Sequence, residues 1–160
     1  KGEPCWPDGA VGSLTHSDGG RGAVVARQGE IRSVGIDAEP HDVLPRGVLD
    51  EISLPIERSQ LSTAPTGLHW DRILFCAKEA TYKAWYPLAG TVLHHEQVRV
   101  HLTADGTFRA EASDGIRMPL RVQGRWRADP DVVVTLAAVA AREVPRDAAT
   151  RRTARGAASR

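Results

Sequence analysis

Two carboxylates lie close together in the segment GIDAEP, residues 35–40. Asp37 and Glu39 are separated by one residue. On an extended segment, side chains two positions apart point to the same side, so both carboxylates can face one cation. Oxygen ligands of this kind select Mg²⁺, with Mn²⁺ as an alternative. A strand end with two solvated acids would have the same sequence, and the motif alone leaves both interpretations open.

A second group of reactive side chains lies in FCAKEATYKAW, residues 75–85. Four residues follow the spacing i, i+3, i+4 and i+7, which places them on one helix face: Glu79, Tyr82, Lys83 and Tyr86. This face can contribute an acid and a cation to a site. The alternative is a simple i, i+4 pair between Glu79 and Lys83, which stabilises a helix by about 0.3 to 0.5 kcal/mol.

A third group, Thr15 and His16, ends the extended segment GSLTHS. A hydroxyl, an imidazole and backbone amides at a strand end can hold a phosphate, although a turn histidine is the simpler interpretation. A Ser–His nucleophile is disfavoured because Ser17 would point away from His16 and no G-x-S-x-G elbow occurs. The phosphate-loop lysine motif and G-x-G-x-x-G are absent. The segment 94–96 (HHE) lacks a matching ligand pair and is expected to be an exposed loop.

The composition predicts one soluble domain. The chain has 160 residues, 21 Lys+Arg against 20 Asp+Glu, 41% hydrophobic residues and no apolar run long enough to span a membrane. The segment 142–160 holds six arginines and two acids, so the remainder is net acidic and does not suggest a nucleic-acid surface. Cys5 and Cys76 lack disulfide or zinc spacing, which favours a reducing cytoplasm.

The elements that must position these groups begin with short strands. The turn Gln28-Gly29-Glu30 predicts a hairpin that joins the second and third of three expected strands, Ala10–Thr15, Ala23–Arg27 and Ser33–Asp37. A helical turn and a short helix opened by proline follow at Val48–Ile52 and Pro55–Leu61.

A long helix is expected from about Asp71, a candidate N-cap, to Pro87. Its buried stripe follows i, i+4, i+7 and i+11 and comprises Ile73, Ala77, Ala80 and Ala84.

Five strand-like segments follow this helix: Val98–Leu102, Thr107–Ala112, Met118–Val122, Gly124–Ala128 and Val132–Ala140. Turns are expected at Asp105-Gly106 and Asp114-Gly115. Strands, then helices, then a meander indicate an α+β fold with helices packed on antiparallel sheets. The tail after Val144 is expected to be disordered.

Taken in order, WPDGAVGSLTHS, GIDAEP and FCAKEATYKAW resemble the three signature motifs of the 4′-phosphopantetheinyl transferases. The similarity is to the surfactin/enterobactin-synthetase type, especially its actinobacterial members. It implies transfer of the phosphopantetheine arm from coenzyme A to a serine of an apo acyl or peptidyl carrier protein. The products would be a holo carrier protein and 3′,5′-ADP. Such phosphoryl-group transfer depends on positioning and charge neutralisation.

The resemblance also assigns roles to residues. Asp37 and Glu39 would ligate Mg²⁺, and Glu79 would complete the metal shell or act as base toward the carrier serine. Lys83 would neutralise the coenzyme A pyrophosphate. Lys78 would lie beside it, and three further residues would hold the phosphates at the adenosine end: Lys1, Thr15 and His16.

The family fold is a pseudo-symmetric pair of α+β lobes with the active site between them. The resemblance implies a partial N-terminal lobe over residues 1–66, a C-terminal lobe over 67–143 and a disordered basic tail over 144–160. Members are normally longer, and this chain opens at Lys1 rather than Met, so we expect it to be truncated at its N-terminus.

The implied partners are coenzyme A and a carrier protein from fatty-acid, polyketide or nonribosomal-peptide synthesis, including siderophore synthesis. We expect a cytoplasmic monomer with no nucleic-acid or membrane partner. Exposed candidates for contact with an acidic carrier are Arg46, Arg58, Arg72 and the Tyr82/Tyr86 edge. The alternatives are a non-catalytic fragment that binds coenzyme A or a carrier protein without turnover, and a Mg²⁺-dependent nucleotide hydrolase of unrelated fold.

Overall fold

In the computed structural model, which describes residues 4–17, 20–112 and 121–141, three strands are followed by the helices and then by four more strands. The strands are β1 (Ala10–Ser17), β2 (Gly20–Arg27), β3 (Ile31–Pro40), β4 (Val98–Leu102), β5 (Thr107–Ala112), β6 (Arg121–Ala128) and β7 (Val132–Ala140). The helices are α1 (Val48–Ile52), α2 (Pro55–Ser62), α3 (Trp70–Ala89) and the short 3₁₀ helix η1 (His95–Gln97). The α+β class expected from the sequence is confirmed.

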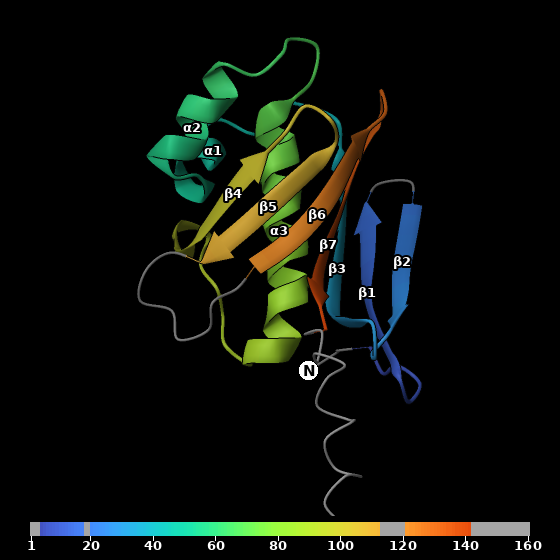
Figure 1. The fold of residues 1–160 in the computed structure, drawn as a ribbon. Helices are drawn as coiled ribbons and strands as arrows, with labels where there is room; N and C mark the ends of the chain where they lie inside the picture. Colours follow the sequence, from blue (N-terminus) through green and yellow to red (C-terminus); the bar gives the residue numbers. More distant parts are fainter. Residues whose placement is uncertain (1–3, 18–19, 113–120, 142–160) are drawn as a thin grey trace, which may run out of the picture.

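The strands form two antiparallel sheets. The larger has the order β3-β7-β6-β5-β4, and β1 pairs with β2 in a sheet of two strands. Figure 1 shows α3 along one face of the larger sheet, α1 and α2 toward β4, and the β1–β2 pair beside β3. Among the described residues, no helix combines the length and the apolar character needed to cross a membrane.

The expected hairpin across Gln28-Gly29-Glu30 is wrong. Its first strand lies in β2 and pairs with β1, while β3 pairs with β7, with Asp37 opposite Thr135. β3 pairs with the apolar strand β7 along most of its length over the core, and this pairing is preferred to the local hairpin with β2.

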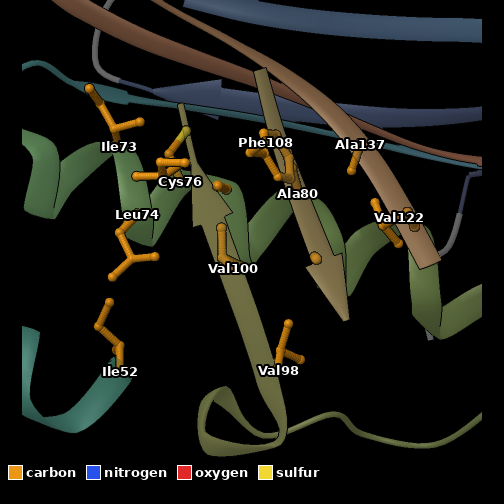
Figure 2. Packing of buried hydrophobic residues seen from close by; sticks show 14 of the residues in the cluster. Ile52, Ile73, Leu74, Cys76, Ala80, Val98, Val100, Phe108, Val122 and Ala137 are labelled. Atoms are coloured by element: carbon orange, nitrogen blue, oxygen red, sulfur yellow. The ribbon is translucent and has the colours of Figure 1, made fainter. Parts of the chain in front are cut away.

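The core lies between α3 and the larger sheet. The stripe Ile73, Ala77, Ala80 and Ala84 is fully buried, as the helical spacing predicts. Figure 2 shows side chains of this helix packed among those of the strands, including Val100 and Phe108. The small side chains on α3 let the helix approach β3 closely.

Gly35 marks the point of closest approach between β3 and α3. A Cβ atom at this position would lie 2.7 Å from the backbone nitrogen of Ala84 and would also overlap the carbonyl oxygen of Ala80. Only glycine fits there, because the obstacle is backbone and cannot rotate away. This crossing places Asp37 within reach of Lys83 and Glu39 within reach of Arg72 in the first turn of α3.

Both ends of α3 differ from the expected ones. The helix begins at Trp70 with His69 as its N-cap, and the Asp71 carboxylate instead accepts a hydrogen bond from the Leu44 amide at 2.8 Å. The helix also continues past Pro87 and ends at Gly90, whose φ of 64° is left-handed. Pro87 lies in the last turn, only Leu88 and Ala89 follow it in the helix, and Gly90 supplies the terminating conformation.

Both edges of the larger sheet are closed by side chains. The β3 amides of Ile36 and Ala38 donate to Ser13 Oγ at 3.1 Å and Thr15 Oγ1 at 3.0 Å. At the other edge, the Val100 amide of β4 donates to Glu57 Oε1 at 2.7 Å. Edge groups satisfied in this way are not free to pair with another strand.

Some expectations remain open. Two strands are expected at Met118–Val122 and Gly124–Ala128, but their described residues form the single strand β6. Three other expectations lie outside the described residues: Lys1, the Asp114-Gly115 turn and the tail over 144–160. The division into lobes at residue 66 stays a prediction. β3 belongs to the same sheet as the C-terminal strands, and β1 and β2 form their own.

Candidate active site

The candidate site lies where β3 crosses α3. Asp37 is buried, and Lys83 on α3 reaches its Oδ1 atom with an Nζ–Oδ1 distance of 2.7 Å. The same ammonium donates to the Ile36 carbonyl oxygen at 3.1 Å. Lys83 therefore pairs across the two elements with Asp37 rather than along the helix with Glu79, which removes the simple i, i+4 interpretation.

The second carboxylate oxygen of Asp37 has a different environment. Oδ2 is buried and, among the described residues, no hydrogen-bond partner reaches it. A buried carboxylate oxygen without a partner is unfavourable by about 1 to 3 kcal/mol or more. A cation that approached this atom would supply the missing interaction, and this is the observation with which a Mg²⁺ ion fits the site.

Glu39, two residues along β3, is held by Arg72 from the first turn of α3. Arg72 Nη1 lies 3.2 Å from Glu39 Oε2, and the guanidinium also donates to the carbonyl oxygens of Asp42 and Val43. Burial and then the charge of Asp37 raise the pKa of Glu39, while Arg72 opposes the increase. Its carboxylate is thus fixed in place but electrostatically disfavoured.

Glu79, on α3, is also affected by the negative charge of Asp37. Its pKa is raised by burial first and by the charges of Asp37 and Glu39, and Lys83 opposes this. The three acids therefore influence one another through space. They are not closed around a common point, since the described part of the chain contains no group of three His, Cys, Asp or Glu side chains arranged to hold a metal ion.

A cavity of about 280 Å³ opens beside Glu79. Tyr82 of α3 lines it on the helix side, and Val92 and Leu93 contribute apolar wall from the segment between α3 and η1. Ionisable side chains such as His94 and Glu96 share the wall with these apolar ones, so the cavity suits a ligand with a flexible neutral chain and a charged end.

His95 also lines this cavity. The expectation of an exposed loop at 94–96 holds for the exposure of His94 and Glu96, whereas His95 is half-buried at the start of a 3₁₀ helix. It begins η1, and its Nε2 atom is 3.6 Å from Glu79 Oε1. Burial and then the Lys78 ammonium lower the pKa of His95, which favours its neutral imidazole.

Lys78 is not available to bind a phosphate in this structure. Its residue is 2% exposed, and its ammonium is 2.9 Å from a carboxylate oxygen of Glu57. It also donates to the carbonyl oxygens of His95 and Val98. The expected contact of Lys78 with coenzyme A is therefore corrected: in this structure Lys78 binds Glu57 and two backbone carbonyl groups inside the protein.

Thr15 and His16 do not share a binding pocket. The Thr15 hydroxyl accepts the Ala38 amide and lies 3.4 Å from Asp37 Oδ1, so it supports the site from within. His16 is exposed and, as the next residue along β1, points the other way. Lys1 lies outside the described residues.

Three residues near the site escaped sequence reasoning or were assigned elsewhere. Arg72 lies seven positions before Glu79, on the same helix face, so the helical spacing carries a signal for it. His95 and Glu57 carry none, because their contacts join segments that are distant in the sequence.

Comparison with known proteins gives two family matches. Residues 33–137 match the model of the 4′-phosphopantetheinyl transferase superfamily, and residues 1–26 match that of the 4′-phosphopantetheinyl transferase N-terminal domain.

Three curated relatives share extensive sequence identity with the chain. It is 55% identical to the 4′-phosphopantetheinyl transferase PptT of Mycobacterium tuberculosis over 146 residues, 84% of this chain and 64% of that protein. It is 47% identical to Npt of Nocardia iowensis over 88% of this chain and 69% of that protein. It is also 47% identical to Svp of Streptomyces mobaraensis, over 88% of this chain and 61% of that protein. The chain thus spans about two thirds or less of most of these relatives, and by these matches it belongs to the 4′-phosphopantetheinyl transferase superfamily.

Proposed function

We propose that this chain transfers the 4′-phosphopantetheine arm of coenzyme A to a serine of an apo acyl or peptidyl carrier protein. The observation that carries the proposal is the cluster at the crossing of β3 and α3, where Lys83 pairs with Asp37 and the Asp37 charge acts on Glu39 and Glu79, beside a cavity of about 280 Å³. The curated relatives are named for this activity.

Asp37 would hold Mg²⁺ through its buried, unpartnered oxygen, together with Glu39 and Glu79. Burial and then repulsion from neighbouring carboxylates raise the pKa of both glutamates, and a divalent cation would relieve that repulsion. When bound, Mg²⁺ would supply charge neutralisation on the pyrophosphate of coenzyme A. Mn²⁺ has the same preference for oxygen ligands and would serve as a substitute.

The side chains of α3 then have separate tasks. Lys83 is anchored by Asp37 and the Ile36 carbonyl oxygen, so its charge is held ready for the pyrophosphate. The cavity lined by Tyr82, Val92 and Leu93 would hold the pantetheine arm. His16, exposed on β1, stays a proposed contact for the phosphates at the adenosine end.

In the transfer itself, the serine oxygen bonds to the phosphorus that carries the pantetheine arm. The bond from that phosphorus to the bridging oxygen breaks, and 3′,5′-ADP leaves. The serine proton goes to an acceptor, and Glu79 is the candidate because its raised pKa improves it as a base. Glu79 as metal ligand alone is the other role, and the site accommodates either.

We further propose that the chain acts as a monomer in the cytoplasm, with an acidic carrier protein as its macromolecular partner. Arg46 is exposed and could contact such a partner, whereas Arg58 is half-buried and donates to the Ser53 carbonyl oxygen.

The test is intact-mass spectrometry of an apo carrier protein incubated with this chain, coenzyme A and Mg²⁺. We expect a mass gain equal to one phosphopantetheine group, abolished by EDTA and by Glu79→Gln. Glu111→Gln, at an exposed position of β5, is the matched control and should transfer normally.

Two outcomes would contradict the proposal. Coenzyme A binding by the folded chain without any mass gain would indicate a non-catalytic binding protein. Release of 3′,5′-ADP in the absence of a carrier protein would indicate a nucleotide hydrolase.

A further inference from the structure

We infer that Lys78 and Glu57 form a positioning pair that fixes the cavity wall opposite Glu79. This inference rests on the proposed function, because it assigns the pair a role in coenzyme A binding. The pair lies outside the cluster of Asp37, Glu39 and Lys83, and its side chains are each 1% exposed.

All three donors of the Lys78 ammonium are used. One carboxylate oxygen of Glu57 is 2.9 Å away, and the carbonyl oxygens of His95 and Val98 are 2.9 and 3.0 Å away. His95 begins η1 and Val98 begins β4, so a single ammonium grips both ends of the short segment that joins them. A lysine has three rotatable donors, which suits this arrangement.

Glu57 fixes the other side of the pair. Its Oε2 accepts the Leu54 amide at 2.7 Å, and its Oε1 accepts the Val100 amide at 2.7 Å. The carboxylate thus ties the start of α2 to the edge of β4. Lys78 and Glu57 together connect α2, α3, η1 and β4 through groups that are shielded from water.

Stability alone does not account for this pair. The desolvation cost of a buried ion pair often cancels its attraction, and apolar side chains of similar size frequently serve a core equally well. The pair instead fixes positions, because each of its hydrogen bonds joins one donor to one acceptor in a defined geometry. It therefore determines where the segment 92–98 lies relative to α3.

That location matters at the site because the same segment forms the cavity wall. Val92, Leu93 and His95 line the hollow that Glu79 also faces, and the His95 ring lies 3.6 Å from the Glu79 carboxylate. Lys78 and Glu79 are adjacent on α3 and point in different directions. Lys78 holds the cavity wall in place, and Glu79 faces the cavity.

The decisive variant is Lys78→Met/Glu57→Gln, which removes both charges and leaves no isolated ion in the core. Lys78→Arg is the milder second variant, since it keeps the charge but cannot direct three donors to the same acceptors. Arg99→Met, at an exposed cation of β4, is the matched control. Each folded variant is measured for kcat and KM with coenzyme A, and for amide hydrogen exchange over residues 92–98.

We expect the double variant to raise KM for coenzyme A about tenfold or more with a smaller change in kcat, because the wall and not the reacting groups is disturbed. Exchange over residues 92–98 should accelerate about tenfold or more, while β7 stays protected. Lys78→Arg should show the same changes to a smaller extent, and Arg99→Met should show neither.

Unchanged KM and unchanged exchange in a folded double variant would overturn the inference. So would unfolding of both Lys78 variants at 20 °C, because the pair would then serve global stability. If the unaltered chain transfers nothing, the proposed function fails, but the exchange measurement still decides whether the pair positions the wall.

Discussion

Asp37 is the residue on which the candidate site depends. One of its oxygens is paired with Lys83, whereas the other is buried without a partner among the described residues. After burial, the charge of the same side chain is the next cause that raises the pKa of both Glu39 and Glu79. A single carboxylate thus orients the cation and sets the electrostatic environment of the other two acids.

Lys83→Met should impair both coenzyme A binding and folding stability. It leaves Asp37 buried without its ammonium, which we expect to lower the free energy of unfolding by about 3 kcal/mol, more than an exposed pair would. KM for coenzyme A should rise as well, because the pyrophosphate loses a cation. Urea unfolding and steady-state kinetics measure the two effects.

The double variant Lys83→Met/Asp37→Asn separates these effects. Removing both charges should restore most of the stability without restoring transfer. Recovery of transfer by the double variant would show that Lys83 serves only to neutralise Asp37.

At this scale the sequence predicted the residue types of the site better than their partners. The spacing of Asp37 and Glu39 and the helical spacing of Glu79 and Lys83 were sufficient to find the cluster. The burial of Lys78 could not be found in this way. Its three acceptors come from segments separated from it by 17 to 21 positions, and no local pattern records them.

At the scale of elements, the crossing of β3 and α3 determines the geometry. Gly35 permits backbone contact, and the alanines of the α3 stripe leave room for it. Because Asp37 follows two residues after Gly35 and Lys83 three after Ala80, the acid and the cation meet just beyond the contact.

Gly35→Ala should therefore be severely destabilising. Its methyl group would collide with backbone atoms of Ala80 and Ala84, and we expect a loss of about 3 kcal/mol together with loss of transfer. Gly29→Ala is the control, since a Cβ there meets nothing within 4 Å. Thermal unfolding of the two variants compares them directly, and equal stability would contradict the close contact.

Ser13 and Thr15 provide a second test at this scale. The variant Ser13→Ala/Thr15→Val removes the two hydroxyls that accept the β3 amides. We expect faster hydrogen exchange at Ile36 and Ala38 and a stability loss of about 1 to 3 kcal/mol per unsatisfied amide. Unchanged exchange at these two amides would show that β1 does not protect the β3 edge.

The order of the elements was largely predictable, and their pairing was not. Hydrophobic alternation identified β4, β5 and β7, and the alanine spacing identified α3. The partner of β3 lies about a hundred residues away in β7, so a nearby turn was a misleading guide. The helix ends were missed because Asp71 has a tertiary partner, the Leu44 amide, in place of a capping role.

For the molecule as a whole, the acids at the site link stability to pH and to Mg²⁺. The pKa values of Glu39 and Glu79 are raised above the ordinary value of 4.5. The folded state therefore holds these protons more tightly than the unfolded state. Stability from these groups must fall as pH rises from about 4.5 through the raised values.

The thermal midpoint of the metal-free chain should consequently decline over this pH range more than that of Glu39→Gln/Glu79→Gln. At pH 7.5, Mg²⁺ should raise the midpoint of the unaltered chain and leave the variant unchanged, since a ligand stabilises the state that binds it. Calorimetry with and without Mg²⁺ measures both. Parallel pH profiles for the two proteins would contradict the assignment of these acids.

The backbone contact at Gly35 also limits how the chain can change in length. Adding one residue to β3 between Gly35 and Asp37 would shift the acid by about 3.3 Å and turn it to the other face of the sheet. Adding one residue to α3 between Ala80 and Lys83 would rotate the lysine by about 100° around the helix axis. We therefore expect the chain to tolerate insertions and deletions only in the loops beyond this crossing, because the spacing from each contact residue to its charged neighbour must stay constant for the site to form.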